Sequence, residues 1–370
     1  MRAIGVVFSN IHDNNVPELV SNRTVGSIPF GGRYRLIDFV LSNMVNSNID
    51  TVGVITKRNY QSLMDHVGSG KDWDLARKDG GLIFLPPFGD NASDSLYNSR
   101  LEALKGIMNF LNRADEEYVV LSDCDCICRV NYDEVIDAHI ASRADITMVY
   151  TKHSADACAE ASVNTLVLDA DGKVENVKYH ENLSGEGNLF MNMYVIRRSL
   201  LANLVKESIS RKTKHFIEDI ILTNTNVLKI KGYEHKGYYA RISSLQAYYN
   251  HSMELLKGDV RAELFGDRSV FTKIRDSAPT KFGSNSIVKN SMIADGCDIQ
   301  GEVENCILFR GVKIARGTKV KNCILMQNTV VGENASLNCI ITDKNVLIRD
   351  RVTLSGAENH TFYIPKGSMV

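Results

Sequence analysis

The sequence predicts an α/β domain with a mixed, mainly parallel sheet, followed by a C-terminal left-handed parallel β-helix. Strand-like apolar runs alternate with helical periods over residues 1–255, which is typical of parallel sheets covered by helices. From residue 284 onward, aliphatic residues recur at six-residue steps instead. The 370 residues are 44% apolar and 24% charged, a composition that excludes a disordered or collagen-like chain and allows about two or three domains.

Residues 1–255 carry the α/β pattern. Strands are expected where Val, Ile and aromatic residues concentrate, at 4–8, 51–56, 117–123, 145–151 and 190–196. Helices are expected where apolar residues repeat with the helical period, at 35–48, 95–113, 132–142 and 244–258. The last of these helices is expected to pack on the α/β domain.

Residues 256–283 are expected to be a linker, because their periodicity is weak, and residues 284–370 form the predicted β-helix. One short phrase returns there four times, beginning at Val288, Val303, Val320 and Ser336. Each six-residue step corresponds to one short strand and one corner, so that aliphatic side chains point inward and stacked coils bury a continuous column. The expected corner residues are Gly296, Gly301, Gly311, Gly317, Gly332 and Asn345.

The charges nearly cancel, with 43 Lys and Arg against 44 Asp and Glu. A chain this balanced is not expected to bind nucleic acid or an anionic membrane surface. The first apolar run is too short for a secretory signal, and no run approaches a membrane span, so we expect a cytoplasmic protein.

Cys124, Cys126 and Cys128 form a C-x-C-x-C pattern. Thiols are metal ligands, but residues two apart in a strand share one face, so the pattern favours one side of a buried strand. No second Cys or Cys/His cluster follows at zinc spacing. We therefore expect no metal at these cysteines.

Several long segments resemble one enzyme family. Residues 28–56 (IPFGGRYRLIDFVLSNMVNSNIDTVGVIT) and 68–89 (with WDL, GG and LPP) resemble consecutive motifs of ADP-glucose pyrophosphorylase, and 281–297 and 331–350 resemble its β-helix. The resemblance implies a Rossmann-like nucleotidyltransferase domain. It also implies the family's reaction, in which ATP and glucose 1-phosphate form ADP-glucose and pyrophosphate with Mg²⁺, the committed step toward glycogen or starch.

The region that aligns with the family's phosphate loop has lost its characteristic residues. Backbone N–H groups reach a phosphate closely only where side chains are small, which is why such loops are rich in glycine. Here no glycine lies between Gly5 and Gly26, and the loop carries Asp13, which would repel phosphate. The basic motif that follows keeps Arg23 but neither lysine, and the nucleotide-binding turn, which aligns with 91–95, also lacks its glycine.

The two metal-binding aspartates of the family align with Asp125 and Arg241. Asp125 is a vestigial metal position or, on the simpler alternative, a strand-end carboxylate with no ligand. Arg241 opposes metal binding because a guanidinium group keeps its positive charge. The family's sugar-phosphate lysine has no counterpart in 179–182. We therefore expect no functional catalytic residues, no bound metal and no required cofactor.

These losses favour a non-catalytic regulatory member of the family. The resemblance implies that such a member assembles with a catalytic ADP-glucose pyrophosphorylase subunit into a heterotetramer. The alternative is an active glucose-1-phosphate adenylyltransferase with altered ligands, which would require Mg²⁺. A third hypothesis, an acyltransferase acting from the β-helix, needs a histidine at a coil corner, but His251 and His360 lie outside the repeats.

A phosphorylated metabolite is expected as an effector, because the family binds such molecules between its two domains. The resemblance makes Arg23, Arg33 and Arg35 the candidate phosphate contacts. Arg35 has a simpler alternative, since it can pair with Asp38 within one helical turn. The family's effector lysine aligns with Asn22, so its contact cannot be carried over.

Overall fold

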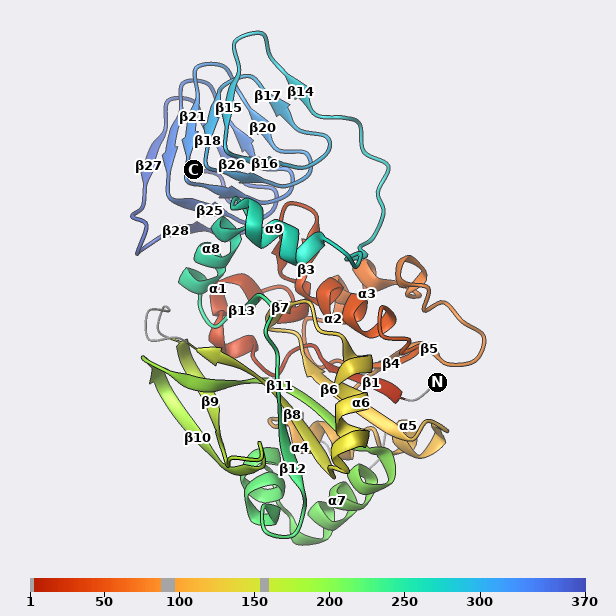
Figure 1. Cartoon of the computed structure of the whole chain (residues 1–370). Helices are drawn as coiled ribbons and strands as arrows, with labels where there is room; N and C mark the ends of the chain where they lie inside the picture. Colours follow the sequence, from red (N-terminus) through yellow and green to blue (C-terminus); the bar gives the residue numbers. More distant parts are fainter. Residues whose placement is uncertain (1–2, 88–96, 154–159) are drawn as a thin grey trace.

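The computed structural model describes residues 3–87, 97–153 and 160–370, and it contains an α/β domain with a β-helix beside it (Figure 1). The α/β domain is built on a mixed sheet in the order β10-β9-β11-β6-β1-β4-β5, with β8 paired to β11 and β12. Its strands are β1 (Ala3–Phe8), β4 (Thr51–Ile55), β5 (Gly81–Leu85), β6 (Tyr118–Asp123), β8 (Ile146–His153), β9 (Glu160–Leu168), β10 (Val174–Leu183), β11 (Gly187–Arg197) and β12 (Ile230–Glu234). Strands β6, β1, β4 and β5 are parallel to one another, whereas β11 runs antiparallel to β6, β8 and β9.

Helices cover both faces of this sheet. Strand β1 explains why, since Val7 joins the apolar cluster on one face while Ile4 and Val6 join the cluster on the other. The first face is covered by α2 (Leu36–Val45), α3 (Gln61–Val67) and α6 (Tyr132–Ser142). The second face is covered by α4 (Arg100–Lys105), α5 (Met108–Arg113) and α7 (Arg198–Arg211). The predicted fold class of the first domain is confirmed.

Two predicted helices have different bounds in the structure. The stretch 95–113 contains α4 and α5 in place of one helix, because Gly106 ends α4 and the chain re-enters a helix at Met108; residues 95 and 96 lie outside the described residues. The last helix is shorter than expected: α8 spans Leu245–Glu254, and a separate α9 spans Gly258–Phe265. The expected linker, 256–283, therefore contains α9 at its start and the first β-helix strand at its end.

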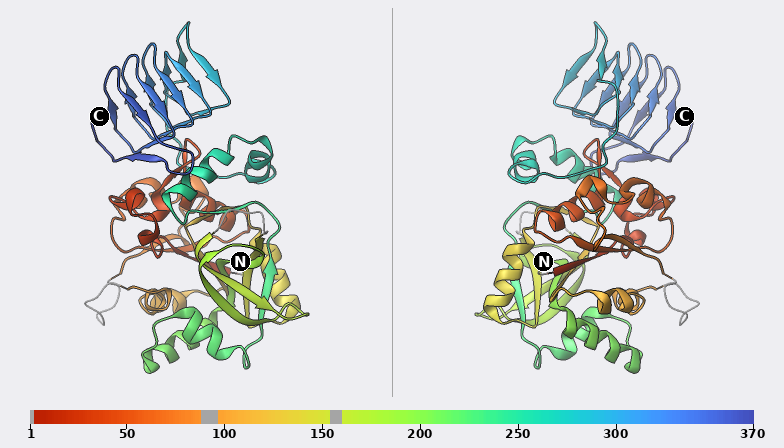
Figure 2. Two further views of the ribbon diagram at one scale, coloured as in Figure 1. Left: turned by 90° about the vertical axis from the view of Figure 1, so that its left-hand side faces the viewer. Right: turned by 90° about the vertical axis from the view of Figure 1, so that its right-hand side faces the viewer.

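The C-terminal domain is the predicted left-handed parallel β-helix, made of three five-stranded parallel sheets whose coils stack as one column (Figure 2). The first sheet contains β14 (Lys281–Phe282), β17 (Asp298–Ile299), β20 (Lys313–Ile314), β23 (Val330–Val331) and β26 (Leu347–Ile348). The second contains β15 (Ile287–Lys289), β18 (Glu302–Glu304), β21 (Lys319–Lys321), β24 (Ser336–Asn338) and β27 (Thr353–Ser355). The third contains β16 (Met292–Ile293), β19 (Ile307–Leu308), β22 (Ile324–Leu325), β25 (Ile340–Thr342) and β28 (Phe362–Ile364).

The recurring asparagine in the repeated phrase stacks along one corner of the β-helix. The side-chain amide of Asn290 donates to Asn305, Asn305 donates to Asn322, and Asn322 donates to Asn338, at 2.7–3.2 Å. The first three have positive φ, a conformation that Asn tolerates better than most residues. This ladder of hydrogen bonds explains why asparagine recurs in the repeated phrase. The inward-facing aliphatic residues alone do not explain that recurrence.

The predicted corner residues serve two different purposes. Gly296, Gly311, Gly317 and Asn345 have positive φ, as expected for corners. Gly301 and Gly332 do not. A Cβ at Gly301 would collide with the carbonyl oxygen of Thr318, and a Cβ at Gly332 would collide with the backbone nitrogen of Asp350, each in the next coil. The prediction from backbone conformation alone was therefore wrong for Gly301 and Gly332, where close approach of neighbouring coils is the reason for glycine.

One face of the β-helix packs on the α/β domain. Strands β19, β22 and β25 turn Ile307, Ile324 and Ile341 away from the column, and these residues join the apolar cluster that contains α2 and Tyr248 of α8. Figure 1 shows α8 and α9 between the two domains. Tyr249 also donates a hydrogen bond to the backbone oxygen of Asn322 at 2.8 Å. The two domains therefore share a continuous buried core.

Among the described residues, no helix is both long and apolar enough to span a membrane.

The stacked column makes a specific prediction on β26, where neighbouring residues face opposite ways. Ile348 is fully buried in the column, whereas Leu347 is 36% exposed. Ile348→Ala should lower the free energy of unfolding by about 2–5 kcal/mol because it leaves a cavity in a close-packed core. Leu347→Ala is the matched control and should lower the free energy of unfolding much less. Urea unfolding measures both variants. Equal losses in the two variants would contradict the assigned strand register.

Candidate functional site

The loop after β1 stands where the family resemblance places a phosphate loop. It contains a short 3₁₀ turn, Asp13–Asn15, followed by α1 (Pro17–Val20). The Asp13 carboxylate points back into the protein and accepts a hydrogen bond from the backbone amide of Val25 at 2.8 Å. Burial raises the pKa of Asp13 to about 7. The loop is thus closed on its own backbone by a carboxyl group.

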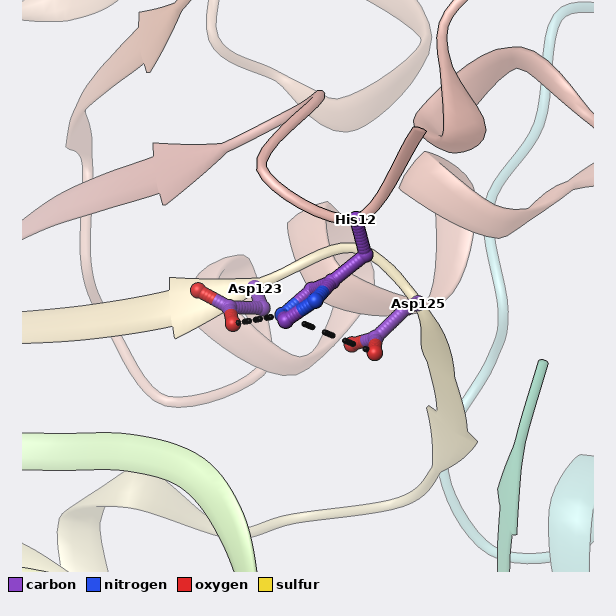
Figure 3. Close-up of side chains that lie close together, drawn as sticks. All are labelled: His12, Asp123 and Asp125. Carbon is purple, nitrogen blue, oxygen red and sulfur yellow. Dashed lines mark hydrogen bonds and ion pairs between the residues drawn. The ribbon is translucent and has the colours of Figure 1, made fainter. Parts of the chain in front are cut away.

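Three side chains meet beside this loop, as Figure 3 shows. His12 comes from the loop, Asp123 from the end of β6, and Asp125 from the turn before β7 (Cys126–Cys128). The Nε2 atom of His12 lies 2.6 Å from Asp123 Oδ2 and 3.7 Å from Asp125 Oδ2. Both carboxylates are buried, at 0% and 1% exposure, so each needs a compensating positive charge or hydrogen bond.

Arg241 provides that charge for Asp125. It lies on β13 (Tyr239–Arg241), which pairs antiparallel with β7 and brings residue 241 opposite residue 126. Its Nε donates to Asp125 Oδ2 at 2.8 Å, and its Nη1 donates to the backbone oxygen of Ser162 at 3.0 Å. The side chain is only 3% exposed. The two positions that align with metal aspartates are therefore joined directly to each other by an ion pair.

Arg100 provides the charge for Asp123. It is the first residue of α4, and its Nη2 lies 2.5 Å from Asp123 Oδ2. Burial opposes ionisation of Asp123, but the Arg100 charge and the contact with His12 outweigh it, so the pKa of Asp123 is lowered. The guanidinium also lies over the rings of Phe8 and Tyr194, at 5.4 and 5.7 Å from their centroids.

The charge balance of this cluster does not fit Mg²⁺. Magnesium is held by carboxylate oxygens and waters that are free to coordinate it. Here the two carboxylates carry two negative charges, and Arg241 and Arg100 carry two fixed positive charges. The oxygen of Asp125 that faces His12 already accepts a hydrogen bond from a guanidinium. A divalent cation would therefore meet no surplus of negative charge.

The cavity next to the cluster is small. It measures about 210 Å³ and is lined by His12, Arg100, Arg241, His215 and Glu218 among others. Small-molecule sites usually enclose about 300–1,000 Å³, so this cavity falls below the range expected for a sugar nucleotide. The family's sugar-phosphate lysine aligns with residues 179–182, which belong to β10. No residue of β10 lines this cavity. Residues 91–95 lie outside the described residues.

The three cysteines of the C-x-C-x-C pattern are buried. Cys126 and Cys128 lie on β7 with Cys124 just before it, and they form no disulfide. Burial raises the pKa of Cys124, which keeps its thiol protonated. Within the described part of the chain, the cluster of possible metal donors contains none of these cysteines.

Arg23, a candidate phosphate contact, is used by the fold itself. Its Nη2 lies 2.7 Å from each carboxylate oxygen of Asp343 in the β-helix, and both side chains are buried. Asp343 also accepts a hydrogen bond from Tyr363 at 2.9 Å. Arg23 therefore links the two domains and is not free to bind a ligand.

Arg33 and Arg35 lie at a small cationic pocket between the domains. Arg33 is exposed, whereas Arg35 donates to the backbone oxygen of Ser62 at 2.5 Å. The alternative pairing of Arg35 with Asp38 is made through the backbone, since the amide of Arg35 donates to Asp38 at 3.0 Å. The Asp38 carboxylate also pairs with His66, at 2.6 Å.

Three further basic residues join them at the pocket: Arg275, Arg310 and Lys344. Burial and the neighbouring Arg35 and Arg23 charges lower the pKa of Lys344 to about 7, and burial lowers the pKa of Arg35 to about 10. The sequence did not suggest these three, since they come from the linker and from separate coils of the β-helix. Positive charges crowded in this way favour an anionic ligand.

The buried ion pair makes a prediction about stability. Arg241→Met should leave Asp125 buried without its partner and lower the free energy of unfolding by about 3–5 kcal/mol. Adding Asp125→Asn should recover a large part of that loss, because the uncompensated charge is then gone. Urea unfolding of the two single variants and the double variant measures this coupling. Additive losses would show that the pair is not energetically coupled.

Comparison with known proteins identifies both domains. The family description "Nucleotidyl transferase" matches residues 19–177, and "GlmU-like, C-terminal hexapeptide" matches residues 278–361. The chain is 36% identical to the glycogen biosynthesis protein GlgD of Bacillus subtilis over 366 residues, which covers 98% of this chain and 96% of the relative. It is 35% identical to the GlgD protein of Geobacillus stearothermophilus, covering 86% of this chain and 83% of the relative.

Enzymes are also among the relatives. The glucose-1-phosphate adenylyltransferase of Fusobacterium nucleatum is 31% identical to this chain over 328 residues, which covers 86% of the chain and 84% of the enzyme. With a matching domain architecture and this coverage, the chain belongs to the glucose-1-phosphate adenylyltransferase family and, within it, to the group of the glycogen biosynthesis proteins GlgD.

Proposed function

We propose that this chain is a non-catalytic regulatory subunit that modulates a catalytic glucose-1-phosphate adenylyltransferase in glycogen biosynthesis. The observation that carries the proposal is the buried ion pair between Arg241 and Asp125, at the two positions that align with metal-binding aspartates. The names of its GlgD relatives place them in glycogen biosynthesis, and the enzymes among its relatives supply the chemistry of the expected partner.

Nucleotidyl transfer has little support from this site. Removing one preorganised electrostatic group from an active site typically costs about 10²–10³-fold in rate. Here a loop that Asp13 closes on its own backbone stands where the family has a phosphate loop. Two guanidinium groups neutralise the carboxylates, and the neighbouring cavity is small. We accordingly propose that the chain needs no Mg²⁺ or other cofactor of its own.

The first test is an activity assay of the chain alone. Purified protein with ATP, glucose 1-phosphate and Mg²⁺ should release no pyrophosphate above the rate without protein. The catalytic homologue from the same organism, assayed in parallel, controls for the conditions. Turnover within the range of the catalytic subunit would overturn the proposal and establish the active adenylyltransferase as the function.

The second test concerns the partner. Co-expression with the catalytic subunit should give a mixed complex, which we propose is a heterotetramer, visible as one species by native mass spectrometry. The complex should differ from the catalytic subunit alone in KM, kcat or effector response. A catalytic subunit whose kinetics are unchanged by this chain would contradict the regulatory role.

We also propose that the cationic pocket between the domains binds a phosphorylated metabolite through Arg33, Arg35, Arg275, Arg310 and Lys344. The cavity is about 30 Å³, which is room for about one water molecule, so a phosphate group would bind at its open mouth with the rest of the ligand outside it. Arg23 is excluded from the proposed contacts because Asp343 already binds it.

This pocket makes a prediction about pH. The free Lys344 side chain loses its proton above about pH 7, whereas a bound anion favours the protonated form. Binding therefore takes up a proton above that pH, and affinity for inorganic pyrophosphate should fall as pH rises from 7 to 9. Calorimetry should show this decline in the wild type and a weaker decline in Lys344→Met, with Lys313→Met, on an exposed strand position, as the control.

A matched pair of arginines separates specific binding from general charge. Arg310→Gln should weaken pyrophosphate binding by about tenfold or more, as expected for the loss of a charged hydrogen bond worth about 1.5–3 kcal/mol. Arg316→Gln removes an exposed charge of the same domain and should have little effect. Equal losses of pyrophosphate affinity in both variants would show that the pocket attracts the anion only through nonspecific charge.

A further inference from the structure

His12, Asp123 and Asp125 form a donor set of the kind that holds metal ions. One ligand atom from each residue lies within 4.8 Å of the ligand atoms of the other two. Among the described residues, this is the cluster of side chains that could hold a metal ion. The three side chains converge from a loop and two strand ends, as Figure 3 shows. Imidazole and carboxylate together suit several divalent ions. What separates this cluster from a metal site is the pair of arginines beside it.

We infer that the Arg241 guanidinium is a built-in cation that stands in place of a divalent metal ion, and that removing it opens a metal site formed by His12, Asp123 and Asp125. The inference concerns the isolated chain and holds whether or not the chain regulates a partner. It is also distinct from the absence of activity, since a metal site alone would not restore the phosphate loop.

The position of Arg241 supports the first half of the inference. Its Nε donates to Asp125 Oδ2, which is the oxygen atom 3.7 Å from His12 Nε2. The guanidinium therefore already hydrogen-bonds to the Asp125 oxygen atom that lies nearest His12, which is the atom a shared ion would use. Its Nη1 is fixed by the backbone oxygen of Ser162 at 3.0 Å, so the group also ties β9 to the cluster. A guanidinium is always charged and cannot leave.

The charges support the second half. Asp123 and Asp125 contribute −2 and Arg100 and Arg241 contribute +2, so these four groups sum to zero in the natural chain. Replacing Arg241 by Met leaves −1, and replacing it by Asp leaves −2 and adds a carboxylate. Arg100 remains on Asp123 in both variants and keeps that side chain in place. A buried cluster with uncompensated negative charge attracts a divalent cation.

The experiment titrates Mn²⁺, which reports binding through the loss of its free-ion EPR signal. The proteins are the wild-type chain, R241M, R241D and the double variant R241D/D125N, each checked for folding by circular dichroism. We expect no saturable Mn²⁺ binding by the wild type and one ion per chain for R241D, with affinity falling by about tenfold or more when Asp125 is also replaced. R241M should bind more weakly than R241D.

Thermal unfolding gives a second readout. Mn²⁺ should raise the melting temperature of R241D and R241M and leave that of the wild type unchanged. If R241D is unfolded without metal, refolding upon addition of Mn²⁺ supports the inference. Saturable binding of one Mn²⁺ by the wild type would overturn it, as would a folded R241D that binds none. Failure of saturating Mn²⁺ to bind or refold both variants would likewise count against it.

Discussion

The buried carboxylate of Asp125 is the constraint on which the site depends. An ionised group with 1% exposure cannot be tolerated without a partner, and Arg241 meets that need at 2.8 Å. To do so, β13 must pair with β7 and carry residue 241 up to the end of the central sheet. The same guanidinium holds the backbone at Ser162, so strand β9 is fixed by it as well. The ion pair between Arg241 and Asp125 is therefore part of the architecture as well as part of the site.

A second buried ion pair, between Arg23 and Asp343, joins the two domains beside their shared core. It joins the segment just after α1 to the fourth coil of the β-helix, and it lies beside the shared apolar core. Lys344, which lines the cationic pocket, is the neighbour of Asp343 in the chain. Charge entering that pocket is therefore felt one residue away from the contact that joins the domains. The proposed anion site therefore lies next to the contact that joins the domains.

Much of the architecture could be predicted from the sequence, because periodicity reports on burial. The strands β1, β4 and β6 and the helix α6 were expected within one or two residues, and the six-residue step correctly indicated the β-helix. The hairpin β9–β10 was not expected, since β10 (VENVKYHENL) is mostly polar and exposed and gives no apolar run. The role of Gly301 was also missed, since close approach between coils is invisible in a linear pattern.

The site was predictable only in part. Aligned motifs identified Asp125 and Arg241, but no local signal showed that they would touch, nor that His12 and Arg100 would join them. The family motif makes Arg23 a candidate phosphate contact because it lies near the family's effector region, but its partner in the structure, Asp343, is 320 residues away in the chain. Long-range pairing of charges is the information that motifs do not contain.

The packing of the β-helix has a consequence for how this protein lineage can change. The α/β domain rests against the side of the column, on Ile307, Ile324 and Ile341, and not against either end. The asparagine ladder repeats the same corner from coil to coil. Inserting or deleting a whole coil at the N-terminal end of the β-helix would change the length of the β-helix by about 4.8 Å. The remaining contacts along its side would stay in register. The length of the β-helix can therefore change only in steps of one coil. Such a change would leave the contact between the β-helix and the α/β domain intact.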